Sequence, residues 1–172
     1  GAERGYAKVV WTSLEPTKTA TVNVEDSEVG ASKVEFQVAE EVFGVWVNVQ
    51  KVDVLPAEVP ALEQKVYKYL EVKHHLKLTE DLVTEGKIFF QVNKAWLDDN
   101  GLSKNNMALY RNVEGQWNEL PTTITNEEEE LVHYEATTPG FSYFAIGQST
   151  APVAGPTVPA VEIGEGAAAG EE

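Results

Sequence analysis

Cysteine is absent from this sequence of 172 residues, and only three histidines are present. The missing thiols exclude a disulfide scaffold, a cysteine zinc site, an iron–sulfur cluster and a thiol nucleophile. Positive charge is also scarce: 13 Lys and Arg stand against 28 Asp and Glu, which gives a net charge of −15. Because nucleic-acid binding needs a basic surface that neutralises phosphates, we expect no nucleic-acid partner.

Long hydrophobic runs are missing as well. No apolar stretch approaches the roughly 20 residues that a membrane-spanning helix needs, and no signal peptide is recognisable. The chain is nevertheless long enough to bury a sizeable core in one domain. Composition therefore describes an acidic domain without cysteine redox chemistry, and it assigns no function.

The last part of the chain has a composition of its own. Residues 148–172 consist mostly of Ala, Gly, Pro, Val and Glu, with four Glu and no Lys or Arg. Such a stretch cannot bury enough apolar area to offset the entropy lost on ordering it. We therefore predict a single domain over 1–147, followed by a tail or linker over 148–172.

Before the tail, apolar residues alternate with a period of two, which is typical of strands. Pro56 and Pro60 are expected to mark a crossing loop between front strands (6–55) and back strands (64–147). Many short strands separated by turns predict an all-β, two-sheet antiparallel sandwich, immunoglobulin-like. One short helix is expected over 94–100. The expected strands are 6–12, 19–24, 34–38, 42–54, 66–72, 87–92, 107–111, 131–136 and 141–146.

Four sequence blocks follow one another in the second half: VYKYLEV at 66–72, FFQVNKAWL at 89–97, LYR at 109–111 with GQWNELPT at 115–122, and YEATTPGFSYFAI at 134–146. In this order and spacing the chain resembles the archaeal PGF-pre-PGF domain, over roughly 22–147. That family occurs in secreted and cell-surface proteins of archaea, often upstream of a C-terminal sorting signal.

The resemblance implies an exported, extracellular β-rich module and implies no enzyme activity or catalytic residues. The sequence shows no hydrophobic sorting helix after the matched region, so we expect any membrane-anchored precursor to have been processed. The residues themselves agree with an architectural role, because the large apolar side chains in the matched blocks suit core packing. These are Trp96, Trp117, Phe141 and Phe144. Gly140, after Pro139, is expected to supply a positive φ that starts the last strand.

Few residues qualify as metal ligands. His74 and His75 are neighbours in a strand, so their side chains point to opposite faces and do not chelate one ion. His133 has no nucleophile beside it in the sequence. Asp98, Asp99 and Asn100 precede a glycine and are weak candidate calcium ligands, as is the acidic stretch 25–28, although the spacing does not fit an EF-hand. Calcium is thus the one candidate cofactor, and no other metal or cofactor site is expected.

Carboxylates are too numerous to indicate catalysis. A glycosidase needs two carboxyl groups facing each other across a cleft, and the sequence singles out no such pair among 28 acids. Residues 127–130 form a run of four Glu that we interpret as a solvated hairpin tip. Contact of this run with a basic partner remains the alternative.

The two ends of the chain suggest self-assembly. An extended segment can add to an exposed sheet edge of a neighbouring subunit, and a repeated head-to-tail contact that does not close builds a filament. We expect a non-enzymatic cell-surface module that forms a filament or surface layer with itself and other layer components. The alternative is an adhesion or spacer domain that binds carbohydrate or protein; burial of Trp11 and Trp46 favours packing, and exposure favours binding. Candidate assembly residues are Val9, Trp11, Val158, Val161 and Ile163.

Overall fold

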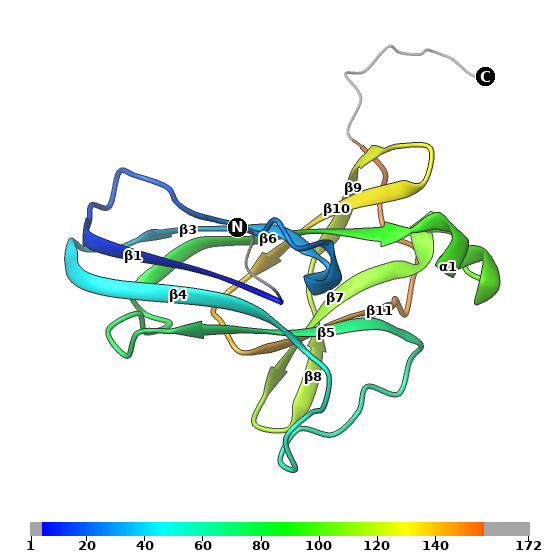
Figure 1. Ribbon diagram of the computed structural model, residues 1–172, viewed down its shortest axis with the longest axis horizontal. Coiled ribbons are helices and arrows are strands. Elements are labelled where there is room, and N and C mark those ends of the chain that lie inside the picture. The colour runs from blue at the N-terminus through cyan, green and yellow to red at the C-terminus, as the bar shows by residue number, and fades with distance from the viewer. Residues whose placement is uncertain (1–4, 157–172) are drawn as a thin grey trace.

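The computed structural model describes residues 5–156, which fold into eleven strands, one α-helix and two 3-10 turns (Figure 1). The helix α1 spans Lys94–Asp99, and the turns η1 and η2 span Ser27–Val29 and Lys104–Asn106. The strands are β1 (Tyr6–Leu14), β2 (Ala20–Asn23), β3 (Ala31–Val38), β4 (Val42–Val52), β5 (Val66–His74), β6 (Val83–Asn93), β7 (Met107–Val113), β8 (Gln116–Glu119), β9 (Thr122–Glu127), β10 (Leu131–Thr138) and β11 (Tyr143–Gln148).

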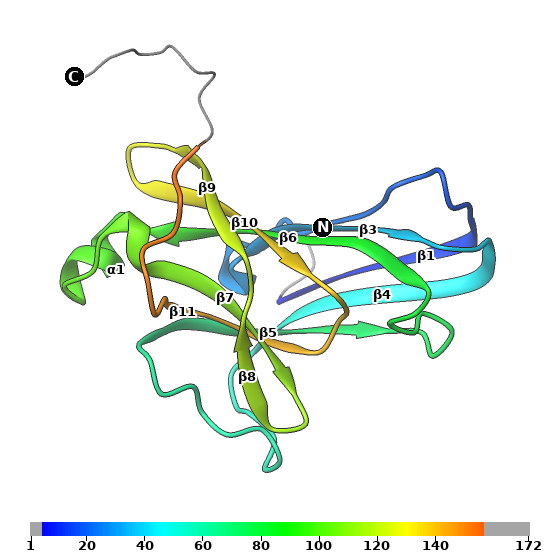
Figure 2. The same cartoon turned by 180° about the vertical axis from the view of Figure 1, so that it is seen from behind.

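The strands form two antiparallel sheets packed face to face (Figures 1 and 2). One sheet has six strands in the order β1-β4-β5-β11-β7-β8, and the other has five in the order β2-β3-β6-β10-β9. This confirms the predicted all-β, two-sheet antiparallel sandwich with one short helix. Strands β8 and β9 were not predicted, because both are short and their sequences are largely polar.

The expected grouping into front and back strands does not correspond to the two sheets. Each sheet takes strands from both halves of the chain, because the chain passes from one sheet to the other repeatedly. The loop 53–65, which contains Pro56 and Pro60, joins β4 to β5, and these strands are neighbours in the six-stranded sheet. The prediction that this loop crosses between two groups is therefore wrong; hydrogen bonding between distant segments, which local composition does not reveal, decides the layers.

The core lies between the sheets and consists of the inward-facing residues of both. Phe90 and Tyr134 stack near its centre with ring centroids 4.9 Å apart and planes at 7°. Phe36 contacts Phe141 edge-on at 5.4 Å. Trp96 packs against the same core from α1. Phe144 is fully buried in the same core, so the core packing predicted for Trp96, Phe141 and Phe144 is confirmed. Trp117 instead packs against a separate cluster.

A second, smaller cluster lies on the outer face of the six-stranded sheet. Leu62 from the loop 53–65 covers Tyr110, Ala108 and Ala145 there, and Trp117 packs against them. The indole nitrogen of Trp117 donates a hydrogen bond to the carbonyl oxygen of Pro60 at 2.8 Å. The long loop is thus held down on one part of this face (Figure 2).

The positive φ expected at Gly140 is wrong: among the described residues the positive-φ glycines are at 5, 30, 44, 101 and 115. A Cβ at Gly140 would lie 2.8 Å from both a guanidinium nitrogen of Arg111 and the Cγ of Glu80. A side chain here would therefore have to displace the ends of these two side chains, so close packing and not an unusual dihedral angle is what constrains this position.

The chain remains attached to the domain after β11. The amide of Val153 donates to the carbonyl oxygen of Asn105, and the carbonyl oxygen of Ala154 accepts from the amide of Ile124 in β9 at 2.9 Å. Residues 149–154 thus lie against η2 and reach β9 at Ala154, and residues 157–172 lie outside the described part of the chain. Within residues 5–156 no helix is long and apolar enough to cross a membrane.

Candidate functional site

Strand β1 is the outermost strand of the six-stranded sheet, and within residues 5–156 it pairs only with β4. The pairing runs in one unbroken register from Tyr6 opposite Gln50 to Leu14 opposite Val42. The amide of Lys51 donates to the carbonyl oxygen of Gly5 in this register, so odd-numbered residues of β1 bond to β4. Because backbone groups alternate along an antiparallel strand, the even-numbered residues direct their N–H and C=O groups away from the sheet.

Four of these even-numbered residues, Tyr6, Lys8, Val10 and Thr12, carry exposed side chains. Tyr6 is 44% exposed and Val10 is 66% exposed, on the face of the sheet that points away from the core. Lys8 lies between them, with its ammonium group 4.9 Å from the centroid of the Trp46 ring. Within residues 5–156 the outer edge of β1 therefore combines unpaired backbone groups with exposed apolar side chains. An edge with both features can pair with another strand.

Val9 and Trp11, both candidate assembly residues, lie on the opposite face of β1. Each is half-buried and packs against the main core, and Trp11 meets Phe36 edge-on at 5.6 Å. Their place at the side of the sandwich leaves them accessible to a further strand laid along β1. The other three assembly candidates, Val158, Val161 and Ile163, lie outside the described residues.

The other three sheet edges offer less to a partner strand. β2 and β8 have only four residues each, and the edge of β9 is contacted by the chain segment that contains Ala154. β1 has nine residues, no proline, no acidic residue and a single Lys. Natural proteins protect long edges with charges, prolines or covering segments, and within residues 5–156 β1 has little of this protection.

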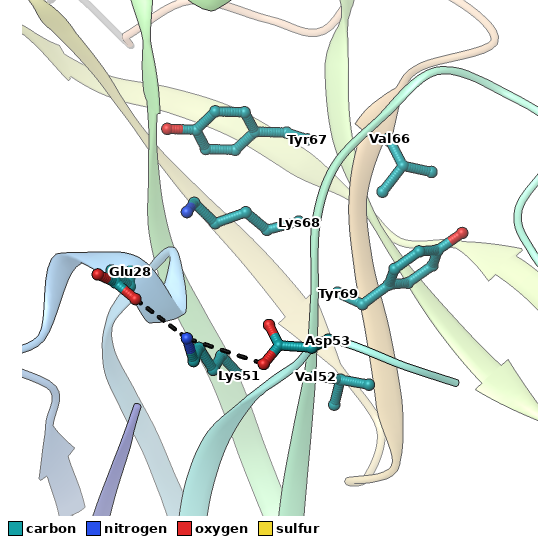
Figure 3. A pocket seen from close by; sticks show the side chains of 8 residues that line it. All are labelled: Glu28, Lys51, Val52, Asp53, Val66, Tyr67, Lys68 and Tyr69. Carbon is teal, nitrogen blue, oxygen red and sulfur yellow. Dashed lines mark hydrogen bonds and ion pairs between the residues drawn. The ribbon is translucent and has the colours of Figure 1, made fainter. Parts of the chain in front are cut away.

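The first residues of β1 are fixed by a group of charges around η1 (Figure 3). The Asp26 carboxylate accepts hydrogen bonds from the amides of Gly5, at 2.6 Å, and Glu28, at 2.9 Å. Lys51 in β4 pairs with Glu28 at 3.0 Å and lies 3.8 Å from Asp53. The hydrogen bond that Lys51 donates to Glu28, followed by the charge of Asp53, raises the pKa of Lys51. This arrangement anchors the start of β1, and within residues 5–156 no strand pairs with its outer edge.

Glu28, Lys51 and Asp53 line a hollow of about 450 Å³ near the beginning of β5. Tyr67 and Lys68 project to the same side of β5, whereas Tyr69 lies on the other side (Figure 3). The pairing of β5 with β11 skips Tyr67, which explains why two consecutive side chains share a side. The two carboxylates of the hollow both contact Lys51, so they are arranged as an ion-pair network and not as a facing acid–base pair.

The histidines and the calcium candidates are separated in the fold. The His74 ring lies near Phe141, whereas the His75 ring faces Trp46, so the two rings do not point to one ion. Asn100 uses its side-chain amide to donate to the carbonyl oxygen of Trp96 at the end of α1. Asp98 and Asp99 are exposed. In the described part of the chain, no three His, Asp or Glu side chains are grouped so that they could hold a metal ion.

The acidic run forms the predicted hairpin tip. β9 ends at Glu127, and β10 begins at Leu131, with the four glutamates exposed between and beside them. Glu127 bridges Lys94, at 2.6 Å, and Lys104, at 2.8 Å. His133 in β10 contacts the Glu128 carboxylate. Much of the tip is therefore tied to the helix α1 and the turn η2 of the same chain.

A second hollow, of about 470 Å³, lies on the outer face of the six-stranded sheet near Trp46. Its walls include Trp46, Glu71 and Tyr143, and burial and the Glu71 carboxylate raise the pKa of Tyr143. Trp46 is only half-buried, and Trp11 packs on the core. By the criterion set from the sequence, Trp11 favours packing, and Trp46 borders a surface that a ligand can reach.

Sequence reasoning singled out β1 but missed Tyr6, Lys8 and Val10 as its outward-facing residues. Their alternation with Ala7, Val9 and Trp11 was visible, yet it does not tell which set faces the core or that β1 is an edge. Comparisons of the chain with family models, with curated proteins and with solved structures found no match. The resemblance to the PGF-pre-PGF domain therefore remains a prediction.

Proposed function

We propose that this chain is a non-enzymatic structural module of an archaeal cell surface, which assembles with copies of itself through the open edge of β1. The observation that carries the proposal is the edge itself: a strand of nine residues in which Tyr6 and Val10 combine outward backbone groups with exposed apolar side chains. A strand of this kind readily pairs with a further strand. The extracellular location rests on the resemblance of the sequence blocks to the PGF-pre-PGF domain.

Charge supports the choice of this edge. With a net charge of −15, most surfaces of two copies repel each other. β1 carries one Lys and no acid, so it is a part of the surface where this repulsion is weakest. Assembly through β1 thus requires no burial of acidic side chains from that strand.

A second candidate function, the binding of a ligand by an adhesion or spacer module, is favoured by the hollow beside Trp46. An aromatic ring next to the carboxylate of Glu71 and the phenol of Tyr143 offers stacking and hydrogen bonding to a sugar ring. Replacement of Trp46 by Ala should then abolish retention of the protein by a polysaccharide gel. Self-assembly through β1 does not require this hollow.

The test of self-assembly makes the same substitution at two exposed valines, one on the edge of β1 and one away from it. Val10→Glu adds a negative charge at the centre of the edge, where it repels acidic copies, whereas Val54→Glu adds the same charge at a position that is 84% exposed outside every strand. Negative-stain electron microscopy and light scattering of the intact chain should show polymers for the parent and for Val54→Glu. Val10→Glu should remain monomeric, and both variants should keep the parent's free energy of unfolding within about 0.5 kcal/mol.

Polymers that survive Val10→Glu unchanged would place the contact away from β1. Monomers in all three samples would contradict self-assembly and leave ligand binding as the better proposal.

A further inference from the structure

The free edge of β1 has a complementary sequence in the same chain, in the segment just beyond the described residues. We propose that residues 157–163 of a second copy add to β1 as an antiparallel strand, in one particular register. This inference rests on the proposed self-assembly and names the segment that makes the contact. It turns the contact into a head-to-tail joint between copies.

The first argument is distance: the segment after Ala154 is too short for Val158 to reach β1 of its own chain. Ala154 is bonded to β9, an outermost strand of the five-stranded sheet, whereas β1 lies beside β2, the outermost strand at the other side. Four strand spacings, about 19 Å, separate β9 from β2. Four residues lead from Ala154 to Val158 and span at most about 14 Å, so a tail that pairs from Val158 onward must come from another copy.

The second argument is the position of the proline. The segment reads Thr157-Val158-Pro159-Ala160-Val161-Glu162-Ile163. When the even-numbered residues of the segment bond to the outward groups of β1, Pro159 directs its nitrogen away from β1, where no donor is needed. A slip by one residue would turn this nitrogen toward β1 and exchange the two faces of the segment. Pro159 also blocks the new outer edge against a further strand.

The third argument is charge and shape in the register that this alignment allows. Glu162 then lies opposite Lys8, which makes no ion pair within residues 5–156. On the same outer face, Ala160 lies opposite Val10. The residues beyond 156 contain four Glu and no Lys or Arg, so the attraction to a strand with one Lys is favourable overall.

On the core-facing side, the register extends the apolar surface of β1. Val161 lies opposite Val9, and Pro159 lies opposite Trp11, so each half-buried side chain gains an apolar neighbour. The large Ile163 lies opposite the small Ala7. Burial of these side chains supplies the main favourable term, because cross-strand pairs of apolar residues stabilise a sheet.

The absence of cysteine makes a cross-linking test simple. Full-length Val9→Cys and full-length Val161→Cys are mixed in a glutathione redox buffer, where the two thiols would lie directly opposite each other in the proposed joint. A disulfide-linked heterodimer is expected. As the matched control, Val9→Cys is mixed with Val158→Cys, which has the same change on the outer face of the segment. This mixture should form the heterodimer at least roughly tenfold more slowly.

A third variant, Val10→Cys alone, tests whether β1 of a second copy, and not the tail, pairs with the edge. If two β1 strands pair with each other about a two-fold axis at Val10, this variant forms homodimers, and the Val9→Cys and Val161→Cys mixture does not. That result would overturn the tail register but keep self-assembly through β1. Monomers by light scattering together with no cross-link in any mixture would overturn both proposals.

A charge exchange gives a second, independent measurement on the assembled protein. Lys8→Glu and Glu162→Lys should each weaken assembly roughly two- to fivefold, as expected for an exposed cross-strand ion pair, and the double variant should restore it. Equal losses in the single variants without restoration in the double variant would contradict the pairing of these two residues.

Discussion

Trp11 in β1 contacts Phe36 in β3 edge-on, with ring centroids 5.6 Å apart and planes at 90°. Phe36 is fully buried and also contacts Phe141, so Trp11 joins an outer strand of one sheet to the centre of the sandwich. The strand whose outer edge we propose for assembly is therefore held in place by a core contact. The proposed joint would cover that edge and extend the core-facing apolar surface to which Trp11 belongs.

Removal of this contact should destabilise the monomer. We expect Trp11→Ala to lower the free energy of unfolding by about 2–3 kcal/mol, less than for a fully buried Trp because the side chain is only half-buried. Urea unfolding followed by circular dichroism measures this value. The control Val10→Ala, on the exposed face of the same strand, should stay within about 0.5 kcal/mol of the parent. Similar losses in both variants would contradict the core role of Trp11.

Arg111 is a buried charge whose partner is exposed. Its guanidinium lies 2.5 Å from the Glu80 carboxylate, with side-chain exposures of 8% for Arg111 and 62% for Glu80. Glu80→Gln removes the neutralising charge from a buried cation, and we expect a loss of about 1–2 kcal/mol in chemical unfolding. Arg111→Met removes the buried charge itself and should cost less than about 1 kcal/mol. A larger cost for Arg111→Met than for Glu80→Gln would contradict this account.

Glu127 should make stability depend on acidic pH. Hydrogen bonds from Lys104 and Lys94 lower the pKa of its carboxyl from 4.5 to about 2. Because the folded state binds this proton less readily, the ionised form stabilises the fold above pH 4.5, and this contribution is lost as the pH falls to about 2. Urea midpoints across this range should fall less steeply for Glu127→Gln than for the parent. Parallel curves for the two proteins would show that the bridge contributes nothing.

Tyr110 should make stability depend on pH in the alkaline range. Burial, followed by the charge of Glu119, raises the pKa of its phenol from 10 to about 12, and the hydroxyl donates to the carbonyl oxygen of Gln148 at 2.6 Å. The folded state holds this proton more tightly, so its contribution to stability is complete below pH 10 and is lost as the pH rises to about 12. Tyr110→Phe should therefore lose less stability across this range. An unchanged slope in thermal unfolding would contradict the burial of this phenol.

Gly86 should tolerate no side chain. A Cβ there would lie 2.6 Å from the carbonyl oxygen of Thr138 in the neighbouring strand β10, and backbone atoms cannot move aside cheaply. We expect Gly86→Ala to lower the free energy of unfolding by about 1–3 kcal/mol in a urea titration. Gly155→Ala is the matched control, because no atom lies within 4 Å of its added Cβ. A neutral Gly86→Ala would mean that β6 and β10 separate without cost.

The sequence alone was sufficient wherever a local pattern decides structure. Alternation of apolar residues predicted nine of the strands, and the short helix lies where expected, ending at Asp99 with Asn100 as its C-cap and Gly101 at a positive φ. The separation of His74 from His75 also follows from the period of a strand. These features depend on residues close together in the chain, so local propensity and side-chain periodicity determine them.

Only the tertiary structure decided which strands are neighbours and which edge stays open. The alternation in β1 would be the same in a central strand, but within the described residues β1 pairs with β4 alone, which leaves Lys8, Val10 and Thr12 with outward backbone groups. Gly140 looked like a turn residue and proved to be a site of close packing against Arg111. Both outcomes depend on contacts between segments far apart in sequence, and such contacts arise only when the two sheets come together.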